Sequence, residues 1–372
     1  MEPAPPPDSA ADASVEVDAT SAVIDTRTAP GLAATSRPVS MRDVARRAGV
    51  SQKTVSRVIN GEPHVRGELR ERIQDAIAEL GYRPNAAARS LVTRRTRRIG
   101  VAAFGAPLHG PSSVLTAVEA VARAEGYALS IQRTDTTGRD ELQSAVEALL
   151  DQGVEGIVLS EPLHLDGGAL EIPAHVAVLT LGSQGLTGRE DELIVGADEF
   201  GAALLATGHL LSLGHRTVHH IAGPSAWVSS RQRCSGWEAA LEGKGLEPPE
   251  TVVGDWSPRS GFESMRLLLE QAGPTAVFVA NDQMAIGAIA AVQRAGLRVP
   301  GDVSIIGFDD LDLAEYLTTP LTTMRQEFDV FAHLGMARLL RAIDGRPPSQ
   351  TRQLVPASLV TRATTGPPPP IR

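Results

Sequence analysis

Short apolar runs of strand length alternate with longer segments of helical periodicity between residues 99 and 307. Strands that alternate with helices in this way form a parallel sheet with helices on both faces, and the length suggests two such lobes. Ligands of these sheets bind beyond the carboxyl ends of the strands. The runs that we interpret as strands are residues 99–104, 128–132, 156–159, 176–181, 193–195, 218–222, 276–280 and 303–307, with helices between them, for example at residues 113–124 and 140–151.

A different pattern precedes the two lobes. Residues 1–36 are rich in Pro, Ala, Ser, Thr and acidic residues and have almost no large apolar side chains, so we expect a disordered tail. Over residues 37–83, apolar residues recur at helical spacing in three short segments, with Gly49 after the first and Gly81 after the third. This arrangement predicts a helix-turn-helix DNA-binding domain. Residues 84–96 follow as a linker that is too short to form a stable helix alone.

Charge is distributed unevenly along the 372 residues. The whole chain has a formal net charge of -9, but residues 37–98 contain 15 Lys and Arg against 6 Asp and Glu. The rest of the chain is therefore acidic. A basic module attached to an acidic body indicates phosphate contact at one end and a different task at the other.

The sequence gives no sign of export or of a membrane anchor. It has no apolar run of about 18 residues, and its N-terminus lacks the basic and then apolar order of a secretory signal. The single cysteine, Cys234, excludes an intramolecular disulfide and a thiolate metal cage, and we interpret it as a partly buried thiol. We therefore expect a cytoplasmic protein without a metal site.

Catalytic motifs are not evident either. His219 and His220 are neighbours in a strand-like run, so their side chains point to opposite faces, and we interpret them as core histidines. We find no nucleophile elbow, no carboxylate pair with an acid–base partner and no glycine-rich phosphate loop. The chain is therefore not expected to be an enzyme or to need a cofactor.

The second helix of a helix-turn-helix enters the major groove of DNA, and its exposed N-terminal residues meet the base edges. Those residues here are Gln52, Lys53 and Arg57, with Thr54 and Ser56 also polar. An arginine can grip guanine O6 and N7 with two hydrogen bonds, which makes Arg57 the principal candidate for base reading. The alternative interpretation is a polar helix face that is merely solvated.

The segment VSMRDVARRAGVSQKTVSRVIN, residues 39–60, closely resembles the headpiece of the lactose-repressor (LacI/GalR) family, and LGYRPNAAARSL, residues 80–91, resembles its hinge helix. In that family, paired hinge helices of a dimer lie in the minor groove, where a leucine enters a base step. Gln52 replaces a tyrosine of lactose-responsive members, so the operator sequence cannot be transferred. The resemblance assigns further DNA contacts to Ser40, Ser51, His64, Arg66, Tyr82, Asn85, Arg89 and Leu91.

Four polar or aromatic residues follow predicted strands in the body of the chain. Asp309 and Asn281 come directly after apolar runs, Arg233 is expected in a polar loop after the strand that ends near residue 222, and Trp256 follows a Gly-Asp pair. Carboxylate, amide and guanidinium groups bind adjacent hydroxyls, and an indole covers the C–H face of a sugar. Each residue also has a structural interpretation, as a helix cap, a surface ion pair or a core residue.

The family resemblance covers residues 37–364 and is most specific at residues 254–262, 279–288, 296–310 and 320–328. It places a sugar-binding and dimerisation domain at residues 97–364 and a flexible tail at residues 365–372. One departure is that Gly182 or Ser183 stands where lactose-responsive members have a sugar-binding aspartate. The resemblance implies hydroxyl contacts from Arg233, Asn281 and Asp309, stacking on Trp256, contacts from Gln326 and Phe328 on a crossover strand, and an apolar wall of Leu108, Pro111 and Val114.

These features together predict a repressor whose binding to double-stranded operator DNA is relieved by a sugar, a galactoside or another small glycoside. The last residues lack the leucine heptads of a tetramerising helix, which favours a homodimer. Two alternatives stay open. A co-repressed regulator would bind DNA more tightly with its ligand, and a stand-alone sugar-binding protein is expected to have an export signal and no hinge.

Overall fold

A computed structural model of the chain describes residues 39–59, 61, 65–83, 90, 93, 95–105, 108–134, 138–160 and 168–370. The chain divides into two compact units, residues 1–85 and residues 86–372. The predicted N-terminal tail lies outside the described residues. So do the DNA contacts predicted for His64, Asn85, Arg89 and Leu91, together with all of the hinge segment 84–91 except Ser90.

The first unit is a three-helix domain of α1 (Met41–Arg47), α2 (Gln52–Ile59) and α3 (Gly67–Leu80). Gly49 joins the first two helices with a φ of 64°, in the left-handed region that glycine enters without steric cost. The predicted helix-turn-helix domain is confirmed. Its core consists of apolar side chains from all three helices and the residues next to them: Val44, Ala45, Ala48, Val55, Val58, Ile73, Ala76 and Tyr82.

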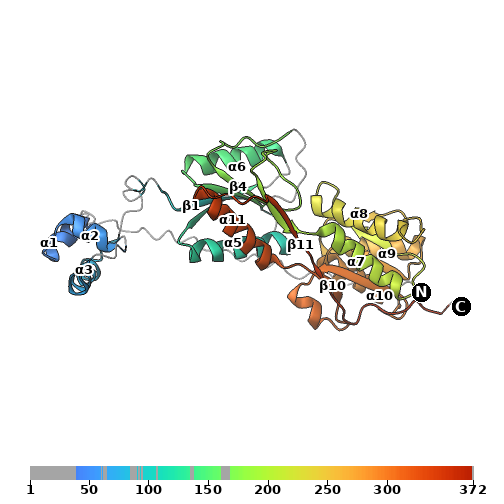
Figure 1. Cartoon of the computed structure of the whole chain (residues 1–372). Helices are drawn as coiled ribbons and strands as arrows, with labels where there is room; N and C mark the ends of the chain where they lie inside the picture. Colours follow the sequence, from blue (N-terminus) through green and yellow to red (C-terminus); the bar gives the residue numbers. More distant parts are fainter. Residues whose placement is uncertain are drawn as a thin grey trace, which may run out of the picture. The chain divides into compact units, whose positions relative to one another are not determined.

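The second unit begins with a lobe built on a parallel sheet of six strands in the order β11-β5-β4-β3-β1-β2. Helices α5 (His109–Ala124) and α11 (Phe328–Ile343) cover one face of this sheet, and α6 (Arg139–Asp151) covers the other (Figure 1). The strands are β1 (Arg98–Phe104), β2 (Ala128–Thr134), β3 (Gly156–Ser160), β4 (Ala177–Leu181), β5 (Leu193–Ala197) and β11 (Arg352–Val355).

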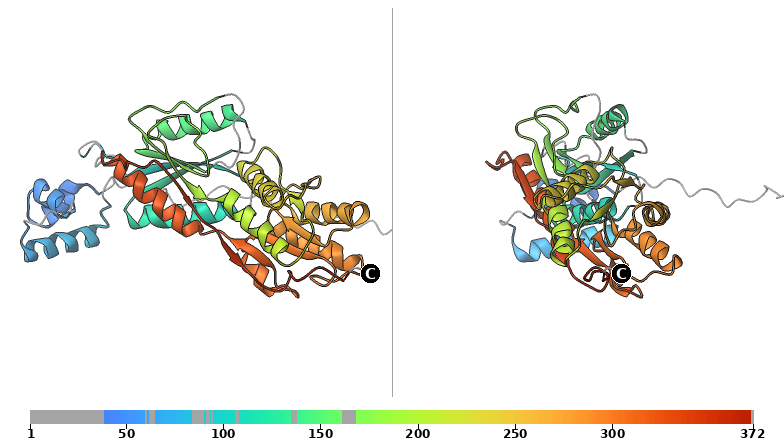
Figure 2. Two further views of the ribbon diagram at one scale, coloured as in Figure 1. Left: turned by 45° about the vertical axis from the view of Figure 1, so that its right-hand side comes forward. Right: turned by 90° about the vertical axis from the view of Figure 1, so that its right-hand side faces the viewer.

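The second lobe has the same layered plan, with strand order β12-β10-β9-β8-β6-β7, and only β12 runs antiparallel to its neighbour. Helices α7 (Glu199–Ser212) and α8 (Val228–Glu242) pack on one face, and α9 (Pro258–Gln271) and α10 (Asp282–Arg294) pack on the other. Figure 2 shows the two layers of helices around each sheet from two further directions. The strands are β6 (His219–Ala222), β7 (Val252–Val253), β8 (Ala276–Val279), β9 (Ser304–Asp309), β10 (Thr322–Arg325) and β12 (Ser358–Val360).

Within the described residues, the chain passes between the two lobes at three crossovers: from β5 to α7, from β10 to α11 and from β11 to β12. The two-lobed parallel-sheet prediction is confirmed. Each predicted strand is present, with ends shifted by one or two residues, whereas β7, β11 and β12 were not predicted. The crossover strand that the resemblance implied at Gln326 and Phe328 is wrong in its extent, because β10 ends at Arg325 and Phe328 begins α11. Helix α5 begins at His109, earlier than expected. Its first turn can contain Pro111, because no intrahelical bond from a backbone N–H is needed there.

The start of the predicted flexible tail is bound to the second lobe. The Gly366 N–H donates to the Ser304 hydroxyl over 3.0 Å, and its carbonyl oxygen lies 3.0 Å from His215 Nε2. The Thr365 hydroxyl lies 3.1 Å from His209 Nε2. Residues 365 and 366 therefore belong to the lobe and not to a flexible tail.

Candidate functional site

Helix α2 of the first unit separates its apolar and polar side chains. Val55 and Val58 are buried in the three-helix core, and Gln52, Lys53 and Arg57 are exposed. The three residues predicted to read bases therefore lie on the solvent face of the helix. This placement makes them accessible to DNA, as major-groove reading requires.

The other DNA contacts predicted in this domain have mixed positions. Ser51 caps α2, because its hydroxyl accepts the Thr54 N–H at 3.2 Å and lies 2.8 Å from the Thr54 hydroxyl. Ser40 donates from its N–H and its hydroxyl to the Asp43 carboxylate, over 2.9 and 2.6 Å. Three further predicted contacts differ in burial: Arg66 is exposed, Ser56 is half-buried and Tyr82 is buried in the core.

A cavity of about 140 Å³ lies in the second unit, where carboxyl ends of strands from both lobes meet two of the crossovers. This volume is far above what one water needs, so the cavity has room for a small molecule. All nine residues predicted to bind the ligand line it: Leu108, Pro111, Val114, Arg233, Trp256, Asn281, Asp309, Gln326 and Phe328. Among its other lining residues, which sequence reasoning missed, are His109, Ser160, Glu199, Trp227, Ser229 and Phe331.

Arg233 lies at the centre of the polar wall. It is on helix α8, not in the loop that the sequence predicted, because this helix begins soon after β6. Its Nε donates to Glu199 Oε2 over 2.7 Å, its Nη1 donates to the carbonyl oxygen of Ala280, and its Nη2 lies 3.5 Å from Asp309 Oδ1. The guanidinium also lies 3.7 Å from the centre of the Phe308 ring. These contacts hold the guanidinium in one orientation.

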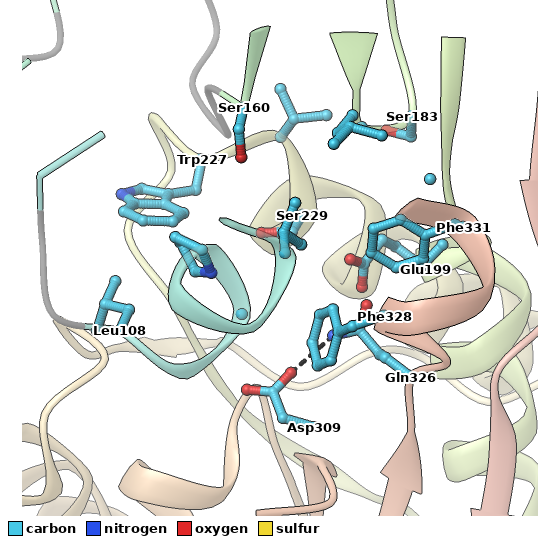
Figure 3. Close-up of a pocket in the computed structure, with 18 of the residues that line it drawn as sticks. Leu108, Ser160, Ser183, Glu199, Trp227, Ser229, Asp309, Gln326, Phe328 and Phe331 are labelled. Carbon is cyan, nitrogen blue, oxygen red and sulfur yellow. Dashed lines mark hydrogen bonds between the residues drawn. The ribbon is translucent and has the colours of Figure 1, made fainter. Parts of the chain in front are cut away.

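Asp309 continues the polar wall towards the second crossover. Its Oδ1 accepts a hydrogen bond of 2.7 Å from Gln326 Nε2, which Figure 3 shows beside the Phe328 ring. Burial raises the pKa of Asp309, and the attraction of Arg233 opposes this shift without cancelling it. Burial acts to lower the pKa of Arg233, but the nearby Glu199 and Asp309 carboxylates outweigh it and the pKa is raised. Arg233 is therefore a charged donor beside two carboxyl groups.

The backbone at Asp309 has a φ of 109°, which L-residues rarely adopt. The carboxyl group of the fully buried Asp282 holds the adjoining segments, because it accepts the Leu311 N–H at 2.8 Å and the Thr323 hydroxyl at 2.6 Å. Burial raises the pKa of Asp282 well above its ordinary value, and the charge of Asp309 adds to this shift. Asp282 therefore supports the turn that places Asp309 at the cavity.

Asn281 both caps a helix and lines the cavity. Its Oδ1 accepts the Met284 N–H at 2.9 Å, at the start of α10, and its Nδ2 donates to the carbonyl oxygen of Trp256 over 3.1 Å. Trp256 has a φ of 74°, so the Asn281 amide stabilises another unusual backbone conformation. The helix-cap interpretation therefore applies to Asn281 together with a place in the cavity wall.

The predicted loss of an aspartate after β4 is visible in the cavity wall, where Gly182 and Ser183 carry no carboxylate. Glu199 supplies a carboxylate from just after β5, the strand that pairs with β4. The sequence contained a signal for Glu199, because it follows a strand as Asp309 does. The polar wall therefore presents guanidinium donors and carboxylate acceptors, which together can bind adjacent hydroxyl groups.

The neighbouring histidines of β6 have no part in this cavity. His220 is fully buried, its Nδ1 lies 2.9 Å from the carbonyl oxygen of Phe278, and its ring stacks on the Phe278 ring at 4.7 Å between centres. Burial lowers the pKa of His220 to about 4, so it is a neutral core residue at neutral pH.

Comparison with known proteins agrees with both parts of this architecture. A family model of bacterial regulatory proteins, lacI family, matches residues 40–85, and a periplasmic binding protein-like domain matches residues 207–365. The lactose operon repressor of Escherichia coli (strain K12) is 38% identical over 333 residues, which are 88% of this chain and 91% of that protein. The chain belongs to the lacI family of bacterial regulatory proteins.

Two solved structures of transcription regulators extend the likeness to three dimensions. The lac repressor dimer bound to operator and the anti-inducer ONPF has a TM-score of 0.78 and 34% identity, covering 89% of this chain and 100% of that one. The transcriptional regulator CelR in complex with cellobiose has a TM-score of 0.63 and 28% identity, covering 88% and 100%. This lacI-family chain is therefore a DNA-binding repressor with an effector-binding domain, in a family of transcription regulators and not of enzymes.

No helix in the described part of the chain is both long and apolar enough to span a membrane.

Proposed function

We propose that this repressor releases its operator when a neutral sugar, a galactoside or another small glycoside, fills the cavity between the lobes. The observation that carries the proposal is the polar wall of Glu199, Arg233 and Asp309 beside an indole. A guanidinium between two carboxyl groups offers paired donors and acceptors for adjacent hydroxyls, and Trp256 offers an apolar surface for the C–H face of a ring.

The position of the cavity supports a mechanism in which the ligand changes the angle between the lobes. Glu199 and Gln326 each lie at a crossover, and other lining residues such as Pro111 and Ser229 come from different lobes. A ligand that binds one arrangement of the lobes better shifts the population towards it, and each tenfold difference in affinity corresponds to about 1.4 kcal/mol. We infer that this shift releases the headpieces from the operator.

A homodimer is the proposed assembly. Leu313 and Tyr316 lie in the 3-10 helix η1 (Asp312–Tyr316). Their side chains are 65% and 78% exposed, which is a high exposed fraction for large side chains with apolar surface. The solved lac repressor relative is a dimer bound to operator. Two headpieces on one dimer fit two half-sites of a palindromic operator, with Gln52, Lys53 and Arg57 towards the bases.

The test is a gel-shift titration of the purified full chain on the DNA upstream of its own gene. Galactosides, cellobiose and purine bases are added in turn. We expect at least one sugar to weaken the complex tenfold or more, and the Asp309→Asn variant to lose that response. Glu263→Gln, on the exposed surface of α9, is the control that should respond like the parent.

Two outcomes contradict the proposal. Retention of the complex with every sugar means that the cavity does not take a sugar inducer. Tightening of the complex by a purine base instead favours the co-repressed alternative.

A further inference from the structure

Charge in the three-helix domain is separated between its helices. Residues 39–59, which contain α1 and α2, have five Arg and Lys against one acidic residue, whereas α3 has two Arg against four acidic residues. The five cations are all exposed and form what we call the basic surface: Arg42, Arg46, Arg47, Lys53 and Arg57. The positive charge of the domain therefore lies on its first two helices.

Two cations of the basic surface have carboxylate neighbours within the domain. Arg46 Nη1 lies 3.7 Å from Asp43 Oδ1, and Arg47 Nη2 lies 2.5 Å from Glu79 Oε2. All four side chains are at least one third exposed, and exposed ion pairs contribute little stability, so another anion can replace either carboxylate. The basic surface can therefore take an anionic partner besides DNA.

An anionic segment of matching charge belongs to the same chain. Residues 1–36, the acidic segment, contain six acidic residues and one Arg. Asp25 is the acidic residue nearest to α1 and precedes Met41 by 16 residues, which can span up to about 55 Å. Helix α3, with 14 residues, is about 21 Å long. Every acidic residue of the segment can therefore reach the basic surface.

We propose that the acidic segment binds the basic surface of its own domain and competes there with DNA. The excess of acidic residues on α3 repels the segment and directs it to α1 and α2. Covalent attachment gives the segment an effective concentration of about 1 mM, so weak ionic contacts are enough to occupy the surface. DNA has a much denser array of charges and gains further affinity from released counterions, so it displaces the segment. The segment thereby weakens binding to any duplex, and base contacts still select the operator.

The two lysines of the chain allow a direct test of this contact. Lys53 lies on the basic surface, and Lys244 lies on the second lobe, near Glu242 and Glu247 in the sequence; both are exposed. A carbodiimide joins a carboxylate to an amine only where the two groups touch. Trypsin then releases residues 1–27, which hold all six acids of the segment. At about 50 mM salt, where screening is weak, we expect mass spectrometry to find this peptide joined to Lys53 and not to Lys244. Excess DNA of unrelated sequence should abolish the product.

A second measurement compares DNA affinity between the full chain and two variants. One variant lacks residues 1–36, and the other keeps their length but has each of the six acids replaced by its amide. We expect both variants to bind operator and unrelated duplex more tightly at about 50 mM salt, by about threefold to tenfold. The factor should be the same on both DNAs, because each must displace the segment, and it should shrink as salt is raised to about 0.2 M. The control replaces Glu263 and Glu270, exposed on α9 in the second lobe, by glutamine and should leave DNA affinity unchanged.

Three results overturn the inference. The first is a cross-linked product that is absent at Lys53 or equally abundant at both lysines. The second is an unchanged DNA affinity of both variants at low salt. The third is a change on the operator alone, which means that the segment contacts operator DNA instead of the basic surface. The cavity has no part in these measurements, so their outcome is independent of whether a sugar releases the operator.

Discussion

Glu199 Oε2 lies 2.7 Å from Arg233 Nε, and this ion pair links the crossover after β5 to helix α8. Arg233 in turn lies 3.5 Å from Asp309, which accepts a hydrogen bond from Gln326 at the crossover after β10. The four side chains form a polar chain that connects two of the crossovers across one wall of the cavity. Under the proposed function, a sugar bound to either carboxylate would contact a group that is linked to both crossovers.

Removal of the Glu199 carboxylate is expected to destabilise the second unit. Loss of one partner of a buried ion pair costs about 3–5 kcal/mol when the other charge is left alone. Arg233 keeps Asp309 as a second partner, so we expect a loss of about 1–3 kcal/mol for Glu199→Ala and less for Glu199→Gln. Urea unfolding measures the change. Glu263→Ala, which removes an exposed carboxylate, is the control, and equal stabilities of the two alanine variants contradict the expectation.

Effector affinity is expected to fall as the pH is lowered. Burial raises the pKa of Asp309, so its carboxylate takes up a proton at a higher pH than an exposed aspartate does. A protonated Asp309 has lost its charge and part of its capacity to accept hydrogen bonds from hydroxyls. Sugar binding should therefore weaken as the pH falls, and the weakening should begin above about pH 4. Calorimetric titration of a sugar across this range measures the effect.

Asp309→Asn supplies the comparison for this pH dependence. It should bind more weakly at neutral pH and vary less as the pH falls. The His109 imidazole interacts electrostatically with Asp309, so His109→Gln shows whether the histidine contributes to the profile. A parent profile that matches that of Asp309→Asn assigns the pH dependence to another group.

The sequence predicted the layers of the fold better than the details of the cavity. Uninterrupted apolar runs of four or more residues between helical segments stand out in the sequence, but β7 has two residues and β11 at the sheet edge mixes Arg and Gln with apolar residues. Asp309 and Asn281 were found because they follow buried strands. Trp227 has no comparable signal in the sequence, because it lines the cavity only through the three-dimensional approach of the two lobes.

The position of Arg233 illustrates the same limit. The residues around it, VSSRQRCSGWE, are mostly polar and do not form a distinct apolar face at helical spacing. The sequence therefore indicated a loop. Helix α8 forms because Trp237 and Leu241 pack into the second lobe, and it carries Arg233 inward with them. Tertiary packing thus decided a local conformation that the sequence pattern left ambiguous.

Two glycine-to-alanine substitutions should have opposite effects on stability. A methyl group on Gly287 in α10 would overlap the backbone oxygen of Pro258 in α9, so Gly287→Ala must separate two packed helices and is expected to cost about 1–3 kcal/mol. Gly208 in α7 has nothing within 4 Å of that position, so Gly208→Ala should stabilise by about 0.5–1 kcal/mol. Urea unfolding compares the two variants, and a neutral Gly287→Ala contradicts the close packing of these helices.

Stability is also expected to fall in acid because of His220. Burial lowers its pKa in the folded protein to about 4, against about 6.5 in the unfolded chain. Below pH 6.5 the unfolded state therefore takes up a proton that the folded state does not, and up to about 3 kcal/mol is lost between pH 6.5 and pH 4. His220→Phe should flatten this part of the profile, whereas His333→Gln, an exposed substitution on α11, should not. Parallel profiles for the parent and His220→Phe contradict this assignment.

The last prediction concerns how Arg57 reads DNA. If Arg57 grips a guanine with two hydrogen bonds, Arg57→Ala should cost about 1–3 kcal/mol of specific operator binding and leave binding to unrelated DNA less affected. Arg57→Lys keeps the charge but loses the paired geometry, so it should not restore specificity. Fluorescence titration on operator and scrambled DNA at several salt concentrations measures both effects, with Arg123→Ala on α5 as a control outside the headpiece. Full recovery by lysine, with weakening that is equal on both DNAs, means that Arg57 contacts a phosphate, since a phosphate contact needs only the charge.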